Sequence, residues 1–187
     1  FQNWKLVERT DNYVKYIITS PNNALITKEI FLPNSKYNIG LRITIKNDAA
    51  VALPIRYKLI GASAFFVRKG IDERFTGADC KIGQQIIRIN NPTRRLKNGA
   101  RVYNDSPSWI SARGRYFSLA LKPKQKEEAC FIEKEGERST RSGVIIGPIT
   151  ILPQDTVTRE FLLYAGPNDT DELKKVSADM VDVVTYG

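Results

Sequence analysis

Apolar and polar residues alternate along most of the chain, and short polar turns separate the alternating stretches. The clearest stretch covers residues 37–46, where every second residue is apolar: Ile39, Leu41, Ile43 and Ile45. A period of two is typical of a half-buried β-strand, because successive side chains point to opposite faces of a sheet. The same pattern predicts two strands within residues 3–19 and others at 24–32, 53–60, 84–89, 117–123, 129–133, 144–152 and 157–165. Strands at roughly ten-residue spacing with polar turns between them indicate an antiparallel β-sandwich.

The stretch from Trp109 to Pro123 contains the strand around which the rest of the chain is organised. In its second half, one set of alternating residues is apolar (Phe117, Leu119 and Leu121) and the other is mixed (Tyr116, Ser118, Ala120 and Lys122). Gly114 lets the backbone bend before the strand, and Pro123 ends it because proline cannot donate a ladder hydrogen bond. Trp109 and Ile110 are expected to lead in from an irregular segment.

From Arg68 to Ser108 the alternation weakens, and only residues 84–89 are predicted to form a strand. The rest of this segment is rich in Gly, Asn, Pro and charged residues, with a basic run at 91–101. A loop of this length is usually functional or disordered. We interpret it as a mobile, solvated loop. Contact of its basic residues with lipid headgroups or an acidic partner is the functional alternative.

Residues 168–181 are predicted to form a C-terminal helix packed on the sandwich. Asp169 or Thr170 is the expected N-cap, and acidic residues follow in the first turn, where the helix dipole favours negative charge. The apolar residues at helical spacing that would press on the sheet are Leu173, Val176 and Met180. We therefore expect residues 1–187 to form a single, mostly β domain with one terminal helix.

The composition permits a folded core, since 42% of the 187 residues are hydrophobic. No apolar run approaches the ~18 residues that a membrane span requires, and the chain begins with Phe, so it is expected to be a piece of a longer protein. The net charge is +9, and residues 168–187 hold five acids and two lysines, which leaves +12 on residues 1–167. Such a body is attracted to anionic partners, although a solvated surface is the simpler interpretation.

Cys80 and Cys130 are the two cysteines of the chain. They could pair in an oxidising compartment, but Cys130 lies in an apolar run that is typical of a buried strand, where free cysteine is common. Sequence cannot supply the geometry that a disulfide requires. A disulfide and two buried thiols both remain open.

Histidine is absent, which excludes His-based acid–base catalysis, a Ser-His-Asp arrangement and His-containing zinc sites. The adjacent carboxylates Asp72–Glu73 and Glu127–Glu128 are interpreted as solvated surface, because neighbours in a strand point to opposite faces. We predict no catalytic, cofactor-binding or metal-binding residues. Most aromatic residues are expected in the core. Phe65–Phe66 is the candidate for a partner surface.

Three stretches together resemble one known family. The first is Trp109 to Pro123, with its Trp, Tyr-Phe pair, Ala and closing Pro. The second runs from Thr27 to Leu59 and includes an Asn47-Asp48-Ala49 turn. The third runs from Tyr164-Ala165-Gly166-Pro167 to the end of the chain. They resemble the large periplasmic domain of the YidC-type membrane protein insertases of Gram-negative bacteria; the resemblance does not extend to residues 69–108. The positions that carry the motifs, with a structural or docking role, are Trp109, Tyr116, Phe117, Pro123, Tyr164, Gly166, Pro167, Tyr186 and Gly187.

The resemblance implies a galactose-mutarotase-like β-sandwich (β-supersandwich) in the periplasm, anchored within an inner-membrane protein. The whole protein would insert and help fold inner-membrane proteins, alone or with the Sec translocon, with this domain as a docking and spacer module. Its implied partners are the Sec accessory subunits SecF and SecD and nascent membrane proteins. An anionic lipid surface is possible, nucleic acid is not expected, and the isolated domain would be a monomer. The alternative is a carbohydrate- or peptidoglycan-binding sandwich. Mutarotases depend on histidine, so their activity is not expected here.

Overall fold

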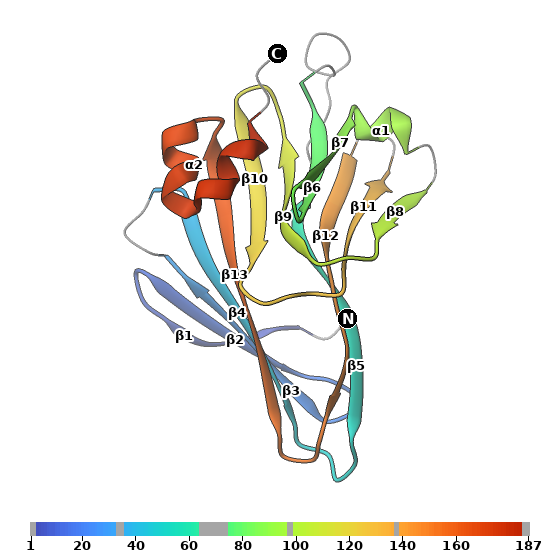
Figure 1. Ribbon diagram of the computed structural model, residues 1–187. Helices are drawn as coiled ribbons and strands as arrows, with labels where there is room; N and C mark the ends of the chain where they lie inside the picture. The colour runs from blue at the N-terminus through green and yellow to red at the C-terminus, as the bar shows by residue number, and fades with distance from the viewer. Residues whose placement is uncertain (1–2, 33–35, 64–74, 97–98, 137–138, 185–187) are drawn as a thin grey trace.

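The computed structural model describes residues 3–32, 36–63, 75–96, 99–136 and 139–184, which form two antiparallel β-sheets packed face to face (Figure 1). The larger sheet contains, in spatial order, β1 (Lys5–Arg9), β2 (Tyr13–Thr19), β3 (Ala24–Phe31), β4 (Asn38–Asn47), β13 (Thr156–Pro167), β10 (Phe117–Pro123), β9 (Pro107–Arg113), β6 (Gly77–Ile82) and β7 (Gln85–Asn90). The smaller sheet contains β5 (Leu53–Ser63), β12 (Ser139–Ile151), β11 (Ala129–Glu135) and β8 (Ala100–Tyr103). This confirms the predicted β-sandwich.

The main core lies between the two sheets. Alternating inward-facing residues of both sheets fill it, as sandwich packing requires. Its most buried members are Cys80, Ile110, Leu121, Cys130, Val144, Ile146 and Phe161. The strands predicted from alternation, such as β4 and β5, place their apolar residues on this inner face.

A second apolar layer lies on the outer face of the larger sheet, where two short helices, α2 (Thr170–Val176) and η2 (Ala178–Val183), cover β13, β10 and β9 (Figure 1). The residues that form this layer are Trp109, Ala120, Tyr164, Leu173, Met180 and Val183. Strand β10 is therefore covered on both faces, and Ser118 and Ala120 are as buried as Leu121. The half-buried strand expected here is wrong in that respect.

The predicted helix at 168–181 is present as two helical segments. Asp169 caps α2, and its side chain accepts hydrogen bonds from the backbone N–H groups of Asp171 and Glu172. The helix ends at Ser177, which is extended, and the 3-10 helix η2 follows. Leu173 and Met180 are fully buried, as their spacing predicted, and Val176 packs at the edge of the same layer.

Within residues 68–108, the predicted strand at 84–89 is present as β7 (Gln85–Asn90), but the loop predicted around it is wrong over the described part of that segment. Residues 75–96 and 99–108 contain β6, β7, β8, the start of β9 and the short helix α1 (Pro92–Arg95). Trp109 and Ile110 lie within β9 and not in an irregular lead-in. Strand β6 escaped detection because a charged residue, Asp79, interrupts its apolar pattern. That carboxylate is buried and accepts hydrogen bonds from Arg88 at 3.0 Å and Arg113 at 2.8 Å.

Candidate functional site

Two of the motif residues, Trp109 and Tyr164, meet under the α2–η2 layer. Trp109 on β9 is fully buried, and its indole Nε1 donates a hydrogen bond to the carbonyl oxygen of Asp179 in η2 at 3.0 Å. Tyr164 on β13 packs in the same cluster, and its hydroxyl donates to the carbonyl oxygen of Pro167 at 2.6 Å. Pro123 lies at the other end of β10, opposite Phe161. These contacts assign Trp109 and Tyr164 a packing role.

Glycine is required at position 166 because two tyrosine rings lie too close to the backbone there for any side chain. A Cβ atom at this position would lie 2.8 Å from Tyr164 Cζ and 2.8 Å from Tyr37 Cγ, nearer than carbon atoms approach in folded proteins. The absence of a side chain therefore lets the tyrosine rings close over β13. Tyr186 and Gly187, the last two motif residues, lie outside the described residues, as do Phe65–Phe66 and Asp72–Glu73.

Ion pairs join the α2–η2 layer to the sheet beneath it. Lys122 Nζ on β10 lies 2.8 Å from Asp179 Oδ2, and Lys81 Nζ on β6 lies 2.6 Å from Asp182 Oδ2. Arg88 on β7 donates to the Asp182 carbonyl oxygen at 2.6 Å. Three strands thus hold η2, in addition to the buried apolar contacts. The sequence did not reveal these ion pairs, because Asp179 follows Lys122 by 57 residues and Asp182 follows Lys81 by 101 residues.

Tyr116 and Phe117 do not belong to the core, contrary to the sequence-based expectation for aromatic residues. They lie in and after the turn between β9 and β10 and are 63% and 60% exposed. Asn168 holds this turn: its backbone N–H donates to the Tyr116 carbonyl oxygen at 2.8 Å, and its side-chain amide donates to the Gly114 carbonyl oxygen at 2.9 Å. Nothing in the local sequence marked Asn168 except its place before the helix cap.

A groove of about 500 Å³ opens between the sheets where β3 and β4 diverge from β5, the edge strand of the smaller sheet. Its lining is mostly apolar, and Trp4, 39% exposed, lies at its rim with Lys28 Nζ 4.3 Å from the ring centroid. Arg56 and Lys58 add positive charge on β5, although each is paired with a glutamate.

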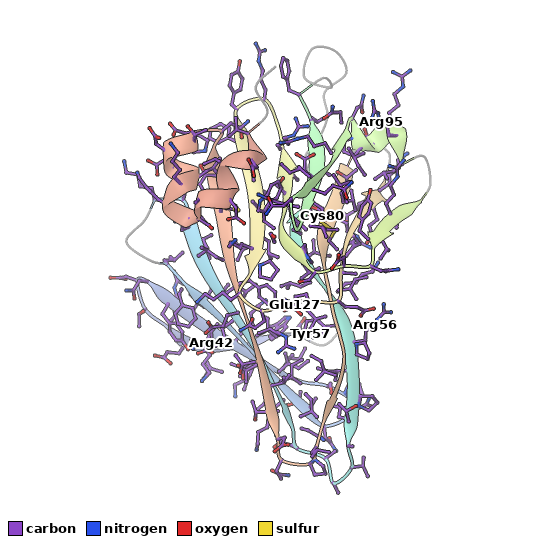
Figure 2. The ribbon with its side chains drawn as sticks, in the orientation of Figure 1. Arg42, Arg56, Tyr57, Cys80, Arg95 and Glu127 are labelled. Carbon is purple, nitrogen blue, oxygen red and sulfur yellow. A yellow bond between two sulfur atoms is a disulfide. The ribbon has the colours of Figure 1, made fainter. Side chains whose placement is uncertain are left out.

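Glu127 and Arg159 are paired inside the sandwich near this groove, and Tyr57 lies close to them. Arg159 on β13 points inward, and its Nε lies 3.4 Å from Oε1 of Glu127, whose side chain is almost fully buried. Burial raises the pKa of Glu127 to about 7, and Arg159 only partly opposes that rise. Tyr57, which lines the groove, lies nearby (Figure 2), and burial together with Glu127 raises its pKa to about 12. The solvated surface expected for Glu127 is therefore wrong, whereas its neighbour Glu128 pairs with Arg56 at 2.8 Å.

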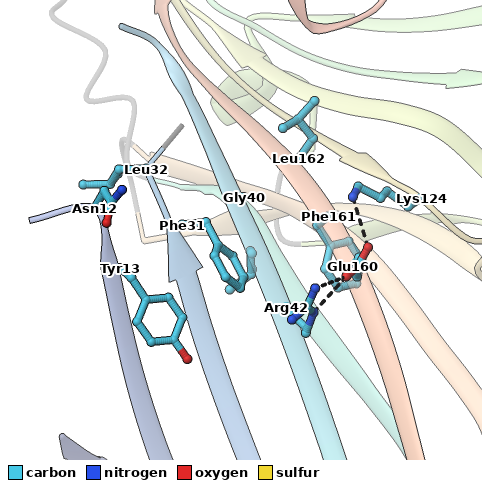
Figure 3. A pocket seen from close by; sticks show the side chains of 11 residues that line it. Asn12, Tyr13, Phe31, Leu32, Gly40, Arg42, Lys124, Glu160, Phe161 and Leu162 are labelled. Carbon is cyan, nitrogen blue, oxygen red and sulfur yellow. Dashed lines mark hydrogen bonds and ion pairs between the residues drawn. The ribbon is translucent and has the colours of Figure 1, made fainter. Parts of the chain in front are cut away.

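A second groove, of about 580 Å³, lies on the outer face of the larger sheet (Figure 3). Phe31 and Leu162 line this groove, as does Gly40, which has no side chain to fill it. Arg42 Nη2 lies 2.7 Å from Glu160 Oε1, and Lys124 Nζ lies 3.0 Å from Glu160 Oε2. These two cations hold the pKa of Glu160 below its usual range through hydrogen bonds and charge. The rim of this groove is thus largely neutralised.

A disulfide joins Cys80 on β6 to Cys130 on β11, so the bond links the two sheets through the core (Figure 2). This decides between the two alternatives that the sequence left open. Among the described residues, no group of three or more acidic or cysteine side chains is placed to hold a metal ion. No helix in the described ranges combines the length and the apolar character needed to cross a membrane.

The two packed antiparallel sheets define a β-sandwich of the galactose-mutarotase-like class. A galactose mutarotase-like protein from Lactobacillus casei ATCC 334 has this fold, with a TM-score of 0.68 at 10% sequence identity; the match covers 87% of this chain and 73% of that chain. An identity this low shows the fold alone.

The chain belongs to the family described as the YidC periplasmic domain, whose model matches residues 2–187. The membrane protein insertase YidC of Geotalea daltonii is 19% identical over 98% of this chain, and that of Nitrosomonas eutropha is 32% identical over 45%. The chain covers 34% of the first relative's length and 14% of the second's. These matches confirm the family resemblance seen in the sequence and mark the chain as a domain of an inner-membrane protein.

Proposed function

We propose that this chain is the docking and spacer module of a membrane protein insertase, which inserts and helps fold inner-membrane proteins. Family membership supports the insertase part of the proposal. The observation that carries the module's role is the attachment of η2, because Trp109, Lys81, Lys122 and Arg88 all bind it to the sheet. A spacer must keep its terminal segment in a fixed orientation, and this attachment does so.

The proposed partners are SecF and SecD, the accessory subunits of the Sec translocon, together with nascent membrane proteins, on the periplasmic side of a Gram-negative inner membrane. The positive body, +12 over residues 1–167, favours acidic surfaces on such partners. We assign no catalytic step to the domain. Its contribution to insertion is positional.

Two measurements on the full-length insertase test the proposal. The first is membrane insertion of a substrate protein by the wild type and by a Lys81→Glu/Lys122→Glu variant, which would detach η2. The second is binding of a purified SecD–SecF complex. Weaker insertion in the variant with normal expression would support the spacer role. A double variant of equal charge change at exposed positions, Lys126→Glu/Lys5→Glu, is the control. Unchanged insertion, together with no SecD–SecF binding by the wild type, would rule the proposal out.

Carbohydrate or peptidoglycan binding is the second candidate function, and the exposed Trp4 at the rim of the inter-sheet groove favours it. The chain has two tryptophans, and Trp109 is fully buried. A change of fluorescence on titration with muropeptides or oligosaccharides would therefore report on Trp4. Saturable quenching that disappears in Trp4→Phe would support this function, and a flat titration would exclude it.

A further inference from the structure

We propose that the turn between β9 and β10 is a membrane-surface anchor that contacts the headgroup region of an anionic bilayer. We name Phe75, Arg115, Tyr116 and Phe117 the aromatic tip. The inference rests on the proposed function in one respect, since it requires a membrane near the domain. It goes beyond that function by assigning the contact to particular residues.

The aromatic tip combines the side chains that suit a membrane interface. Phe75 is 39% exposed, and Tyr116 and Phe117 are exposed by more than half. The guanidinium carbon of Arg115 lies 5.0 Å from the ring centroid of Phe75 and 5.1 Å from that of Tyr116. Within the described part of the chain, Arg115 forms no ion pair. The amphipathic Tyr116 ring and the long cationic side chain of Arg115 suit the headgroup level, and the apolar Phe75 and Phe117 rings suit the acyl boundary just below it.

Hydrogen bonds fix the conformation of the turn that carries Arg115, Tyr116 and Phe117. The Gly114 N–H donates to the Phe117 carbonyl oxygen at 2.8 Å and closes the turn. Asn168 then binds the carbonyl oxygens of Gly114, Arg115 and Tyr116, and it accepts a hydrogen bond from the Ser118 hydroxyl at 2.5 Å. A turn fixed in this way loses little conformational entropy when its side chains enter a new environment.

The size and the charge of the tip favour a bilayer over a protein partner. A stable protein interface uses roughly 20–30 residues on each side, whereas the tip consists of three consecutive residues at the β9–β10 turn and Phe75, which precedes β6. Figure 1 places the β9–β10 turn and α1, which carries the exposed Arg94 and Arg95, at one end of the molecule. Anionic headgroups attract the exposed arginines of this end, and insertion of a few rings requires only a small contact.

Flotation of the 187-residue chain with lipid vesicles tests the inference. The vesicles are phosphatidylethanolamine with phosphatidylglycerol, and phosphatidylcholine alone for comparison. We expect the wild type to bind the anionic vesicles, and Tyr116→Ser/Phe117→Ser to bind about tenfold more weakly or worse. The matched control is Val51→Ser/Leu152→Ser, which removes two exposed apolar side chains from the turns at the opposite end. It should bind as the wild type does.

A second pair of variants separates location from net charge. Arg115→Glu and Lys126→Glu change the charge equally, and both positions are exposed. We expect Arg115→Glu to weaken binding to anionic vesicles about fivefold or more, and Lys126→Glu to weaken it less than twofold. Thermal unfolding midpoints like that of the wild type establish that the variants are folded.

Absence of wild-type binding to either vesicle, or equal losses in tip and control variants, would overturn the inference. A tip variant that loses vesicle binding but keeps SecD–SecF binding separates the anchor from the docking role. If the tip variants Tyr116→Ser/Phe117→Ser and Arg115→Glu lose SecD–SecF binding but still bind vesicles, the tip contacts a protein partner. That result would likewise overturn the inference. The vesicle result does not depend on the insertion and SecD–SecF measurements, so the anchor can be supported or overturned even if the proposed function fails.

Discussion

Cys80 and Cys130 are bonded across the core, so one covalent link connects the nine-stranded sheet to the four-stranded sheet. Both sulfur atoms belong to fully buried residues in the main apolar cluster. The two cysteines are 50 residues apart in the chain, and the intervening segment includes β7, β8, β9 and β10. The bond therefore constrains the unfolded chain over a region that includes most of the segment where the sequence pattern is weakest, residues 68–108.

Replacement of both cysteines by alanine should lower the free energy of unfolding. For a loop of this length, the chain-entropy model gives about 4 kcal/mol. Urea unfolding of the wild type and of Cys80→Ala/Cys130→Ala measures the difference. A thiol assay on the denatured, unreduced wild type should find no free thiol. Two free thiols per chain, or a double variant as stable as the wild type, would contradict the disulfide's role.

Glu127 should make stability depend on pH in a range where this chain has no histidine to do so. Its pKa is raised from 4.5 to about 7 by burial, so between these values the folded state binds more protons than the unfolded state. Stability should therefore fall as pH rises from about 4.5 to about 7 and level off above that range, by at most roughly 3 kcal/mol.

Urea unfolding of the wild type and of Glu127→Gln across this pH range isolates the effect. The glutamine is nearly isosteric and does not titrate, so the difference between the two curves should grow steadily from pH 5 to about 7. Parallel curves would show that the Arg159 guanidinium keeps Glu127 charged in the folded state, and the pKa of this carboxyl would then be normal or low.

Gly166→Ala should destabilise the domain, because the added methyl group would lie 2.8 Å from the rings of both Tyr164 and Tyr37. Overpacking of this kind costs about 1–3 kcal/mol. Gly99→Ala is the control, since the added methyl group would lie 3.7 Å from the Leu96 carbonyl oxygen, an ordinary van der Waals distance. Thermal unfolding should separate the two variants by several degrees. Equal midpoints would show that the rings can move aside.

The sequence predicted those strands whose two faces differ. In β4, apolar residues face the second sheet and polar ones face outward, so a period of two remains visible. Strand β6 shows no such period, because it buries a charged residue, Asp79. The pairing of this carboxylate with Arg113, 34 residues away, makes the burial possible. Pairings at that distance cannot be derived from a local pattern, and the same holds for the disulfide.

The candidate site was predicted in part for a similar reason. Trp109 and Tyr164 were named from the family motif, and the structure brings them together in one buried cluster. The role of Asn168 depends on carbonyl groups of a turn more than 50 residues earlier. Sequence alone placed Asn168 next to a helix cap and could not reveal what its amide would bind.

The Trp109 indole should stabilise the attachment of η2 more than the fold as a whole. Trp109→Phe keeps an aromatic ring but removes the hydrogen bond to the Asp179 carbonyl oxygen and leaves that group without its buried donor. Loss of the bond and of part of the side-chain volume should cost about 1–3 kcal/mol. Amide hydrogen exchange should accelerate in residues 170–183 more than in β11 or β12.

Trp4→Phe is the matched control, because the same substitution there affects a partly exposed ring at the groove rim. It should change stability by less than about 0.5 kcal/mol and leave exchange in residues 170–183 unaltered. If the two variants behave alike, η2 is held by the ion pairs of Lys81 and Lys122 and the indole is dispensable. If Trp109→Phe alone loosens residues 170–183, the buried tryptophan is what makes the terminal segment rigid, as a spacer requires.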